Sequence, residues 1–109
     1  MVDFDVSISP REAIEKIDNE IINGSVTGEK INEYIRQFDD RTVAVVVYEK
    51  HYLRAQNRVS LTAVIDNLHE ATHVHLVGSG GGQLFNADGG AADDFEICAY
   101  AALFDYVVK

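Results

Sequence analysis

Residues 42–77 place the strongest constraint on the fold, because they carry three successive β patterns. Residues 42–53 are rich in Val and Tyr, as is typical of a central strand. In residues 59–66 and 72–77, apolar side chains alternate with others, so the apolar ones share one face of a strand. Asn57 with Arg58, and then residues 67–71, indicate reversals of the chain. We therefore expect three consecutive antiparallel strands.

The beginning of the sequence predicts a half-buried strand followed by a helix. Apolar and polar side chains alternate in residues 2–9, which is the pattern of a strand with one buried face. Ser9 and Glu12 have the spacing of a capping box around Pro10, which favours a helix start there. Isoleucines at positions 14, 17 and 21 continue the helix, and we expect Gly24 to end it in the left-handed conformation.

Residues 25–40 fit two kinds of element. The spacing of the apolar residues is compatible with the stripe of a helix: Ile31, Tyr34, Ile35 and Phe38. The neighbouring segments instead favour an edge strand, which is the interpretation we prefer. Asp39 and Asp40 then predict a turn into the strand that begins at residue 42.

A glycine-rich segment separates the predicted sheet from a last helix. Residues 78–82 read Gly-Ser-Gly-Gly-Gly and are expected to interrupt the strand pattern, which residues 83–85 could resume. We expect the helix to cover residues 92–108, with acidic residues in its first turn, as its dipole favours. Its apolar side chains are too numerous for one narrow stripe. The helix should therefore be buried on more than one side, across a sheet or between a sheet and a second subunit.

These elements define an α+β fold in a single domain, residues 1–109. Their order is β-α-β-β-β-β-α, and the simplest packing is an antiparallel sheet of about five strands with both helices on one face. This order resembles the TATA-binding-protein-like topology, a likeness of fold that carries no function with it.

Charge and cysteine content exclude several classes of partner. The 109 residues include 9 Lys and Arg against 18 Asp and Glu, so the net charge of −9 repels nucleic acids and anionic membranes. A cationic partner or a small neutral ligand fits this charge better. Cys98 is the only cysteine, which matches a reducing compartment, and no apolar run approaches the ~20 residues that a membrane helix needs. We expect a cytoplasmic location.

The glycine-rich segment is the first candidate for a binding site. It lacks the Lys-Ser or Lys-Thr of a P-loop and does not match the dinucleotide pattern, so a bulge or tight turn at the end of a strand is the simpler interpretation. Another ligand remains open, because glycine lets backbone amides approach it closely. The candidate ligand-binding residues are Gly80, Gly81, Gly82, Gln83, Tyr48 and Arg58.

His73 and His75 are the second candidate. Two residues apart on a strand, their imidazoles project from the same face, where a divalent metal could bridge them. The simpler alternative is the solvated side of an alternating strand, and no Cys pair or acidic residue at a diagnostic interval supports metal. Cys98 is expected in the buried core. No catalytic constellation and no cofactor are predicted.

Three short motifs give the chain a resemblance to a known family. They are Val-Tyr-Glu-Lys-His-Tyr at 47–52, Asn-Arg-Val-Ser-Leu at 57–61 and Ser-Gly-Gly-Gly-Gln at 79–83. In these motifs, and in the leading strand and helix, the chain resembles small bacterial proteins of the domain of unknown function 6054. The resemblance implies a bacterial or archaeal cytoplasmic protein without an assigned activity.

Two functions are compatible with these observations. The first is a non-enzymatic binding or self-association module, which we expect to form a homo-oligomer, most simply a dimer. The alternative is a small ligand- or metal-binding protein, or an enzyme, that uses His73, His75 and residues 78–82.

Overall fold

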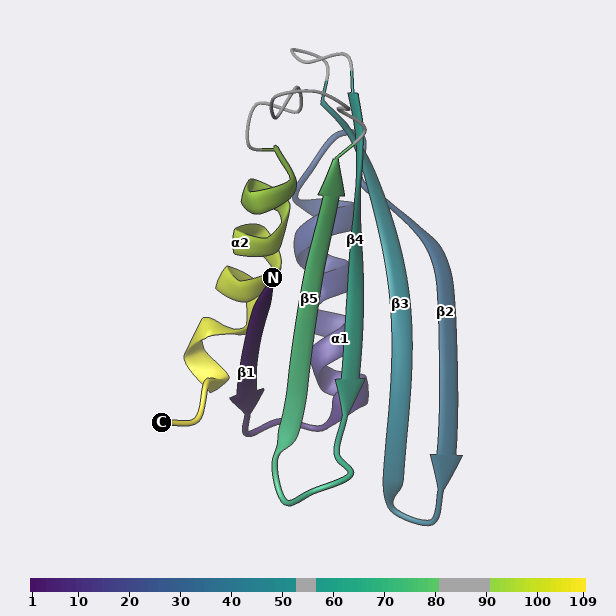
Figure 1. Ribbon diagram of the computed structural model, residues 1–109, viewed down its shortest axis with the longest axis vertical. Helices are drawn as coiled ribbons and strands as arrows, with labels where there is room; N and C mark the ends of the chain where they lie inside the picture. The colour runs from purple at the N-terminus through teal and green to yellow at the C-terminus, as the bar shows by residue number, and fades with distance from the viewer. Residues whose placement is uncertain (53–56, 81–90) are drawn as a thin grey trace.

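A computed structural model describes residues 1–52, 57–80 and 91–109 (Figure 1). Five strands form one antiparallel sheet in the order β1-β5-β4-β3-β2, and the predicted α+β order of elements is confirmed. The elements are β1 (Val2–Val6), α1 (Pro10–Asp18), β2 (Glu29–Phe38), β3 (Arg41–Tyr52), β4 (Asn57–Asp66), β5 (Thr72–Gly80) and α2 (Ala91–Leu103).

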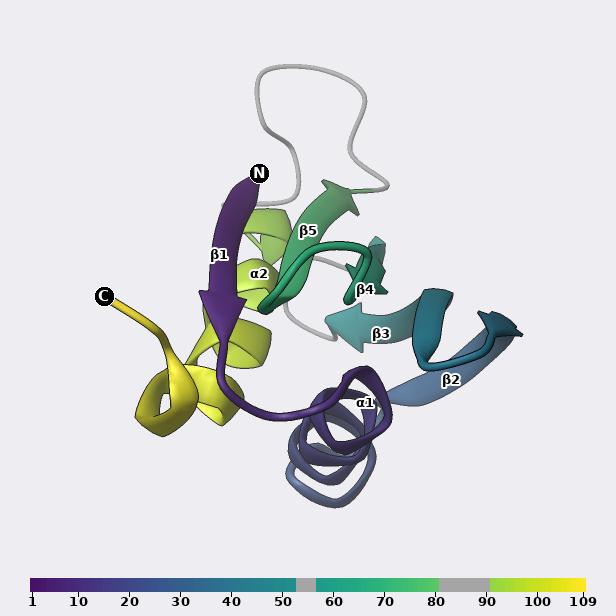
Figure 2. The same ribbon diagram turned by 90° about the horizontal axis from the view of Figure 1, so that it is seen from below.

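The helices form a second layer against the sheet. Helix α1 packs against β3 and β4, α2 packs against β5 and β4, and the two helices contact each other. Because β1 and β2 lie at opposite edges of the sheet, the chain passes through α1 from one edge to the other (Figure 2). The strands β2 to β5 then follow one another as neighbours.

One apolar core fills the space between the layers. The alternation read from the sequence is borne out, because Leu61, Ala63 and Ile65 are fully buried while Thr62 and Val64 between them are half-buried. The helices contribute a matching set of buried side chains: Ala13, Ile14, Ile17, Ile21, Phe95, Ala99 and Leu103. No helix among the described residues is long and apolar enough to cross a membrane.

Helix α1 starts as predicted but ends differently. The Ser9 hydroxyl accepts from the Glu12 amide at 3.1 Å, and the Ser9 amide donates to the Glu12 carboxylate at 3.2 Å, which completes the capping box. At the other end a π-helical turn, Asn19–Asn23, follows the α-helix. The left-handed prediction for Gly24 is wrong, because its φ is −90°. Glycine is needed for space, since a Cβ there would lie 2.3 Å from the Glu20 carbonyl oxygen.

The sheet contains residues that the sequence had placed in turns. Gly78, Ser79 and Gly80 continue β5 without a break in register, so the predicted interruption at this point is wrong. Asn57 and Arg58 likewise belong to β4 and pair with β3, rather than forming a reversal. Backbone pairing with a neighbouring strand outweighs the local preference of glycine and asparagine for turns. The predictions for residues 53, 81–83, 85 and 88–90 lie outside the described residues.

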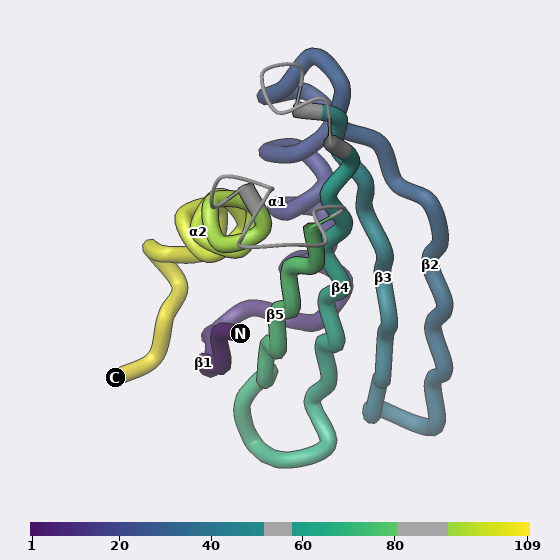
Figure 3. Tube along the Cα trace, turned by 45° about the horizontal axis from the view of Figure 1, so that its top comes forward, coloured from purple at the N-terminus to yellow at the C-terminus, as the bar shows by residue number. Residues whose placement is uncertain are grey.

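The last helix is shorter than expected. It ends at Leu103, a 3₁₀ turn (Phe104–Tyr106) follows, and Val107 forms an antiparallel bridge with Val6. The Ser7 amide donates to the Tyr106 carbonyl at 2.8 Å, and the Val108 amide donates to the Asp5 carbonyl at 2.9 Å. The prediction of helix to residue 108 is therefore wrong. The chain leaves the helix (Figure 3), and residues 106–108 instead bond to backbone groups along the outer edge of β1 and the residue after it.

The backbone of helix α2 packs very close to that of β5. A Cβ on Gly78 of β5 would lie 2.3 Å from the Ala92 carbonyl oxygen. The Gly78 amide donates to the buried carboxylate of Glu96 at 2.7 Å, and the same carboxylate contacts the Met1 amino group at 2.9 Å. Glu96 therefore joins α2, β5 and the start of β1 at one point.

Candidate functional site

The face of the sheet opposite the helices has an apolar centre. No described helix or strand covers it, and Figure 1 shows α1 behind the sheet. The centre consists of half-buried valines on three adjacent strands: Val43, Val45, Val47, Val64 and Val77. Strand β3 supplies most of them because its sequence is apolar at consecutive positions, so both of its faces are apolar. We call this surface the open face.

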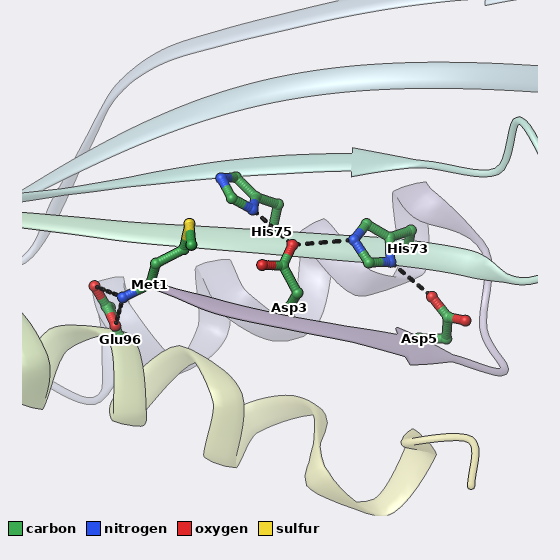
Figure 4. A network of polar contacts seen from close by, with 6 residues as sticks. All are labelled: Met1, Asp3, Asp5, His73, His75 and Glu96. Carbon is green, nitrogen blue, oxygen red and sulfur yellow. Dashed lines mark hydrogen bonds and ion pairs between the residues drawn. The ribbon is translucent and has the colours of Figure 1, made fainter.

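A row of acidic and histidine side chains borders the open face along β1 and β5 (Figure 4). His73 lies between two carboxylates, with Nδ1 2.7 Å from Asp5 Oδ1 and Nε2 3.1 Å from Asp3 Oδ1. His75 Nδ1 lies 2.6 Å from the same Asp3 oxygen. Since both ring nitrogens of His73 face carboxylate oxygens, the doubly protonated imidazolium satisfies both contacts. We call these four residues the Asp–His row.

The structure places His73 and His75 on one face, as their spacing predicts, but Asp3 lies between them. His73 Nε2 and His75 Nδ1 both contact the same oxygen of this carboxylate. Within the described part of the chain, no group of three or more His, Cys, Asp or Glu side chains is arranged to hold a metal ion. Metal binding by the two histidines stays a prediction.

The Asp–His row makes part of the stability depend on pH. The pKa of His73 is raised above 6.5, first by the hydrogen bond to Asp5 and then by that to Asp3, while burial opposes the rise. This contribution is complete below pH 6.5 and is lost as the pH rises through the raised pKa. The pKa of Asp3 is lowered below 3.8 by its bonds to His75 and His73, so its contribution is lost only in acid.

We expect the stability difference between wild type and His73→Gln to shrink as the pH rises from about 6 to about 8. His73 is 43% exposed and its partners Asp5 and Asp3 are 50% and 43% exposed, so the change should stay below about 1 kcal/mol. Urea unfolding across this pH range measures it, with His69→Gln, in the exposed β4–β5 loop, as the control. A difference that does not vary with pH would contradict the role of His73.

The opposite end of the open face brings two of the predicted ligand-binding residues together. Arg58 and Gly80 line a shallow hollow of about 200 Å³ with Ser60 and Ser79. Arg58 Nη1 lies 2.9 Å from the Glu49 carboxylate, which also lines this hollow. The other glycine-segment candidates, Gly81, Gly82 and Gln83, lie outside the described residues.

Tyr48 lies on the other face of the sheet. Its side chain is fully buried, and its hydroxyl donates to Asp18 Oδ1 at 2.6 Å. Burial, followed by this hydrogen bond, raises the pKa of Tyr48 well above its ordinary value of 10.0. The structure therefore does not bring Tyr48 to the hollow that Arg58 and Gly80 share.

A groove between α1 and β2 was not predicted from the sequence. It measures about 290 Å³ and has Ile14 and Ile35 among its lining residues. Lys30 of β2 lies 2.8 Å from Asp18 of α1 and also pairs with Glu33. The charged residues of this groove come from two separate elements, so no local spacing in the sequence could reveal it.

Helix α2 and the turn that follows it each expose one large apolar side chain. Phe95, Ala99 and Leu103 are buried in the core, whereas Ile97 and Phe104 are 60% and 59% exposed. Cys98 is half-buried beside the core rather than within it. Burial raises the pKa of its thiol, which disfavours the reactive thiolate.

Comparison with known proteins identifies the family. No curated protein and no solved structure matches the chain. A family of unknown function, DUF6054, matches residues 1–104, which is nearly the whole sequence. The chain therefore belongs to the DUF6054 family, as the motifs in its strands had indicated.

Proposed function

We propose that the protein is a non-enzymatic cytoplasmic binding module whose open face binds the surface of a basic partner protein. The observation that carries this proposal is the valine centre of the open face, on the side of the sheet where polar residues normally face water. An apolar centre inside a polar border is the usual anatomy of a protein interface.

The size of the open face suits a protein better than a small molecule. Strands of 5, 10, 12, 10 and 9 residues give a face of about 750 Å² at ~3.4 Å per residue and ~4.8 Å between strands. One partner of a standard interface contributes ~800 Å². By contrast, the hollow lined by Arg58 and Gly80 measures only about 200 Å³, and most small-molecule sites have ~300–1,000 Å³.

The charge of the border selects the kind of partner. Asp66 extends the Asp–His row onto β4, directly opposite His73. With Asp3 and Asp5 it gives this side three carboxylates against two histidines. The chain as a whole has a net charge of −9. Two copies that packed open face to open face with these rows aligned would bring like charges together, whereas a basic surface would be attracted to them.

Photo-crosslinking tests this proposal in cells. A photo-reactive amino acid at Thr62, among the valines, should form a covalent adduct with one defined protein. The same amino acid at Ile97, on the exposed side of α2, serves as the matched control. The adduct partner is then purified, and its affinity is measured in solution.

We expect Val45→Lys to weaken that affinity by at least about tenfold, since it places a charge in the apolar centre. Asp66→Lys should weaken it as well, and added salt should do the same to wild type. Ile97→Lys should leave the affinity unchanged. Equal binding by wild type and Val45→Lys, or the same adduct from position 97, would overturn the proposal. Cooperative melting of Val45→Lys and Asp66→Lys shows that a loss of affinity is not caused by unfolding.

A further inference from the structure

Strand β2 is the least covered element of the sheet. It pairs with β3 on one side, and no described strand pairs with its other side. Eight of its ten residues are exposed, and Lys30 and Ile35 are half-buried. Tyr34 and Phe38 are 54% and 78% exposed, and in Figure 2 β2 lies at the end of the sheet far from α2. A long edge strand of this kind can pair with another chain.

The regular part of β2 is symmetric about Ile35. A bulge between Lys30 and Asn32 ends the regular pairing on one side. Asp39, with a φ of 55°, begins the turn that ends it on the other. Between them Asn32 to Phe38 form an unbroken ladder with β3, and Ile35 is its midpoint. A two-fold axis through Ile35 would therefore pair the whole regular segment with itself.

The backbone groups at the outer edge fit the same axis. Phe38 and Arg41 close a two-residue turn, so Phe38 and every second residue before it direct their backbone groups toward β3. Glu33, Ile35 and Gln37 then direct theirs outward. With the axis at Ile35, these outward residues fall opposite one another and can exchange both N–H and C=O.

We propose that a second copy of this chain binds at β2, antiparallel and with Ile35 opposite the partner's Ile35, so that the two sheets become one. Side chains on both faces complement each other in this register. On the open face, Tyr34 lies opposite the partner's Arg36, and Arg36 already donates to the Tyr34 hydroxyl at 3.0 Å within one chain. On the helix face, Glu33 lies opposite the partner's Gln37. Since Arg11 donates to Gln37 at 3.1 Å within each chain, a positive charge also lies near Glu33.

The neighbouring registers fit less well. A shift of the axis to Arg36 would place Arg36 opposite the partner's Arg36, and like charges directly opposite each other are destabilising. A shift to Tyr34 would place Gln37 opposite Ile31, at the bulge, and so lose regular pairs. The charges along β2 are mixed in sign, unlike the acidic border of the open face. A second copy therefore suits this edge, and it leaves the open face free for another partner.

Disulfide trapping tests both the contact and its register. In a Cys98→Ser background, Ile35→Cys should form a disulfide-linked dimer, because opposite residues of a hydrogen-bonded pair lie ~5.5 Å apart between Cα atoms. Arg36→Cys and Tyr34→Cys are the matched controls, since each lies ~7–8 Å from its own copy in this register. We expect Ile35→Cys to crosslink at least about tenfold faster than either control. Faster crosslinking at position 36 or 34 would overturn the register.

Sedimentation of the unmodified chain tests the association itself. We expect a species of twice 12.1 kDa, which Ile35→Lys converts to monomer by placing two charges at the axis. Gln37→Pro should do the same by removing one outward N–H, while its bonding to β3 is unaffected. Ser79→Ala, on β5 and far from β2, should leave the dimer intact. A strict monomer at a protein concentration on the order of 100 µM, or a dimer that survives both β2 variants, would overturn the proposal without bearing on the open face.

Discussion

Gly78→Ala should lower the free energy of unfolding by about 3 kcal/mol. The new methyl group would lie 2.3 Å from the Ala92 carbonyl oxygen, which is backbone and cannot rotate away. Either α2 moves off the sheet or β5 bends, and forcing extra volume into a packed site costs ~1–3 kcal/mol. The same movement lengthens the 2.7 Å bond from the Gly78 amide to the buried Glu96 carboxylate, and an unmet buried group costs a further ~1–3 kcal/mol.

Urea unfolding measures this loss, and Ser79→Ala is the matched control. Ser79 follows Gly78 on the same strand but is exposed on the other face, so its loss should change stability by less than about 0.5 kcal/mol. A Gly78→Ala protein that unfolds within about 1 kcal/mol of wild type would show that α2 does not depend on this close approach.

Tyr48→Ala should cost about 4 kcal/mol, the largest effect expected of a single substitution considered for this chain. Tyr48 is fully buried between the sheet and α1, so truncation removes its packing and leaves a cavity. Tyr48→Phe keeps the ring and removes only the hydroxyl that donates to Asp18 at 2.6 Å. It should cost about 1–2 kcal/mol, because Asp18 retains its contact with Lys30.

The two Tyr48 variants separate packing from hydrogen bonding when their urea unfolding curves are compared. Equal losses for Tyr48→Phe and Tyr48→Ala would mean that the hydroxyl, rather than the ring, stabilises this part of the core. A negligible loss for both would contradict the burial of Tyr48 and would return it to the group of candidate ligand-binding residues.

The fold was predictable from the sequence where the determining pattern is local. Alternation in residues 59–66 identifies the buried side of β4, and the capping box at Ser9 gives the first residue of α1 within one position. Side-chain period and helix-end hydrogen bonds act between residues a few positions apart, so a single sequence records them.

Features set by distant partners were not predictable in this way. Gly78 and Gly80 favour turns locally, yet pairing with Leu61 and Val59 keeps them in β5. Val107 continues an apolar helical pattern, yet it bridges to Val6, which is about a hundred residues earlier. The spacing of His73 and His75 placed them on one face but could not show that Asp3 lies between them.

The candidate surfaces were likewise predictable only in the part that depends on local sequence patterns. The apolar run in β3 was visible in the sequence, but only the arrangement of the helices shows that one side of it stays uncovered. Likewise, the segment around Ile35 was recognisable as an edge strand. Its symmetry about one residue depends on the bulge and the turn at its two ends, which are features of the folded backbone.

The placement of β1 next to β5 has a consequence for the order of assembly. During synthesis on a ribosome, β1 has no neighbour in this sheet until Thr72 to Gly80 have emerged, whereas β2, β3 and β4 each meet a partner as soon as the next strand is made. The aspartates of β1 therefore meet their histidines only after the rest of the meander exists, and the acidic border is the last part of the open face to be completed.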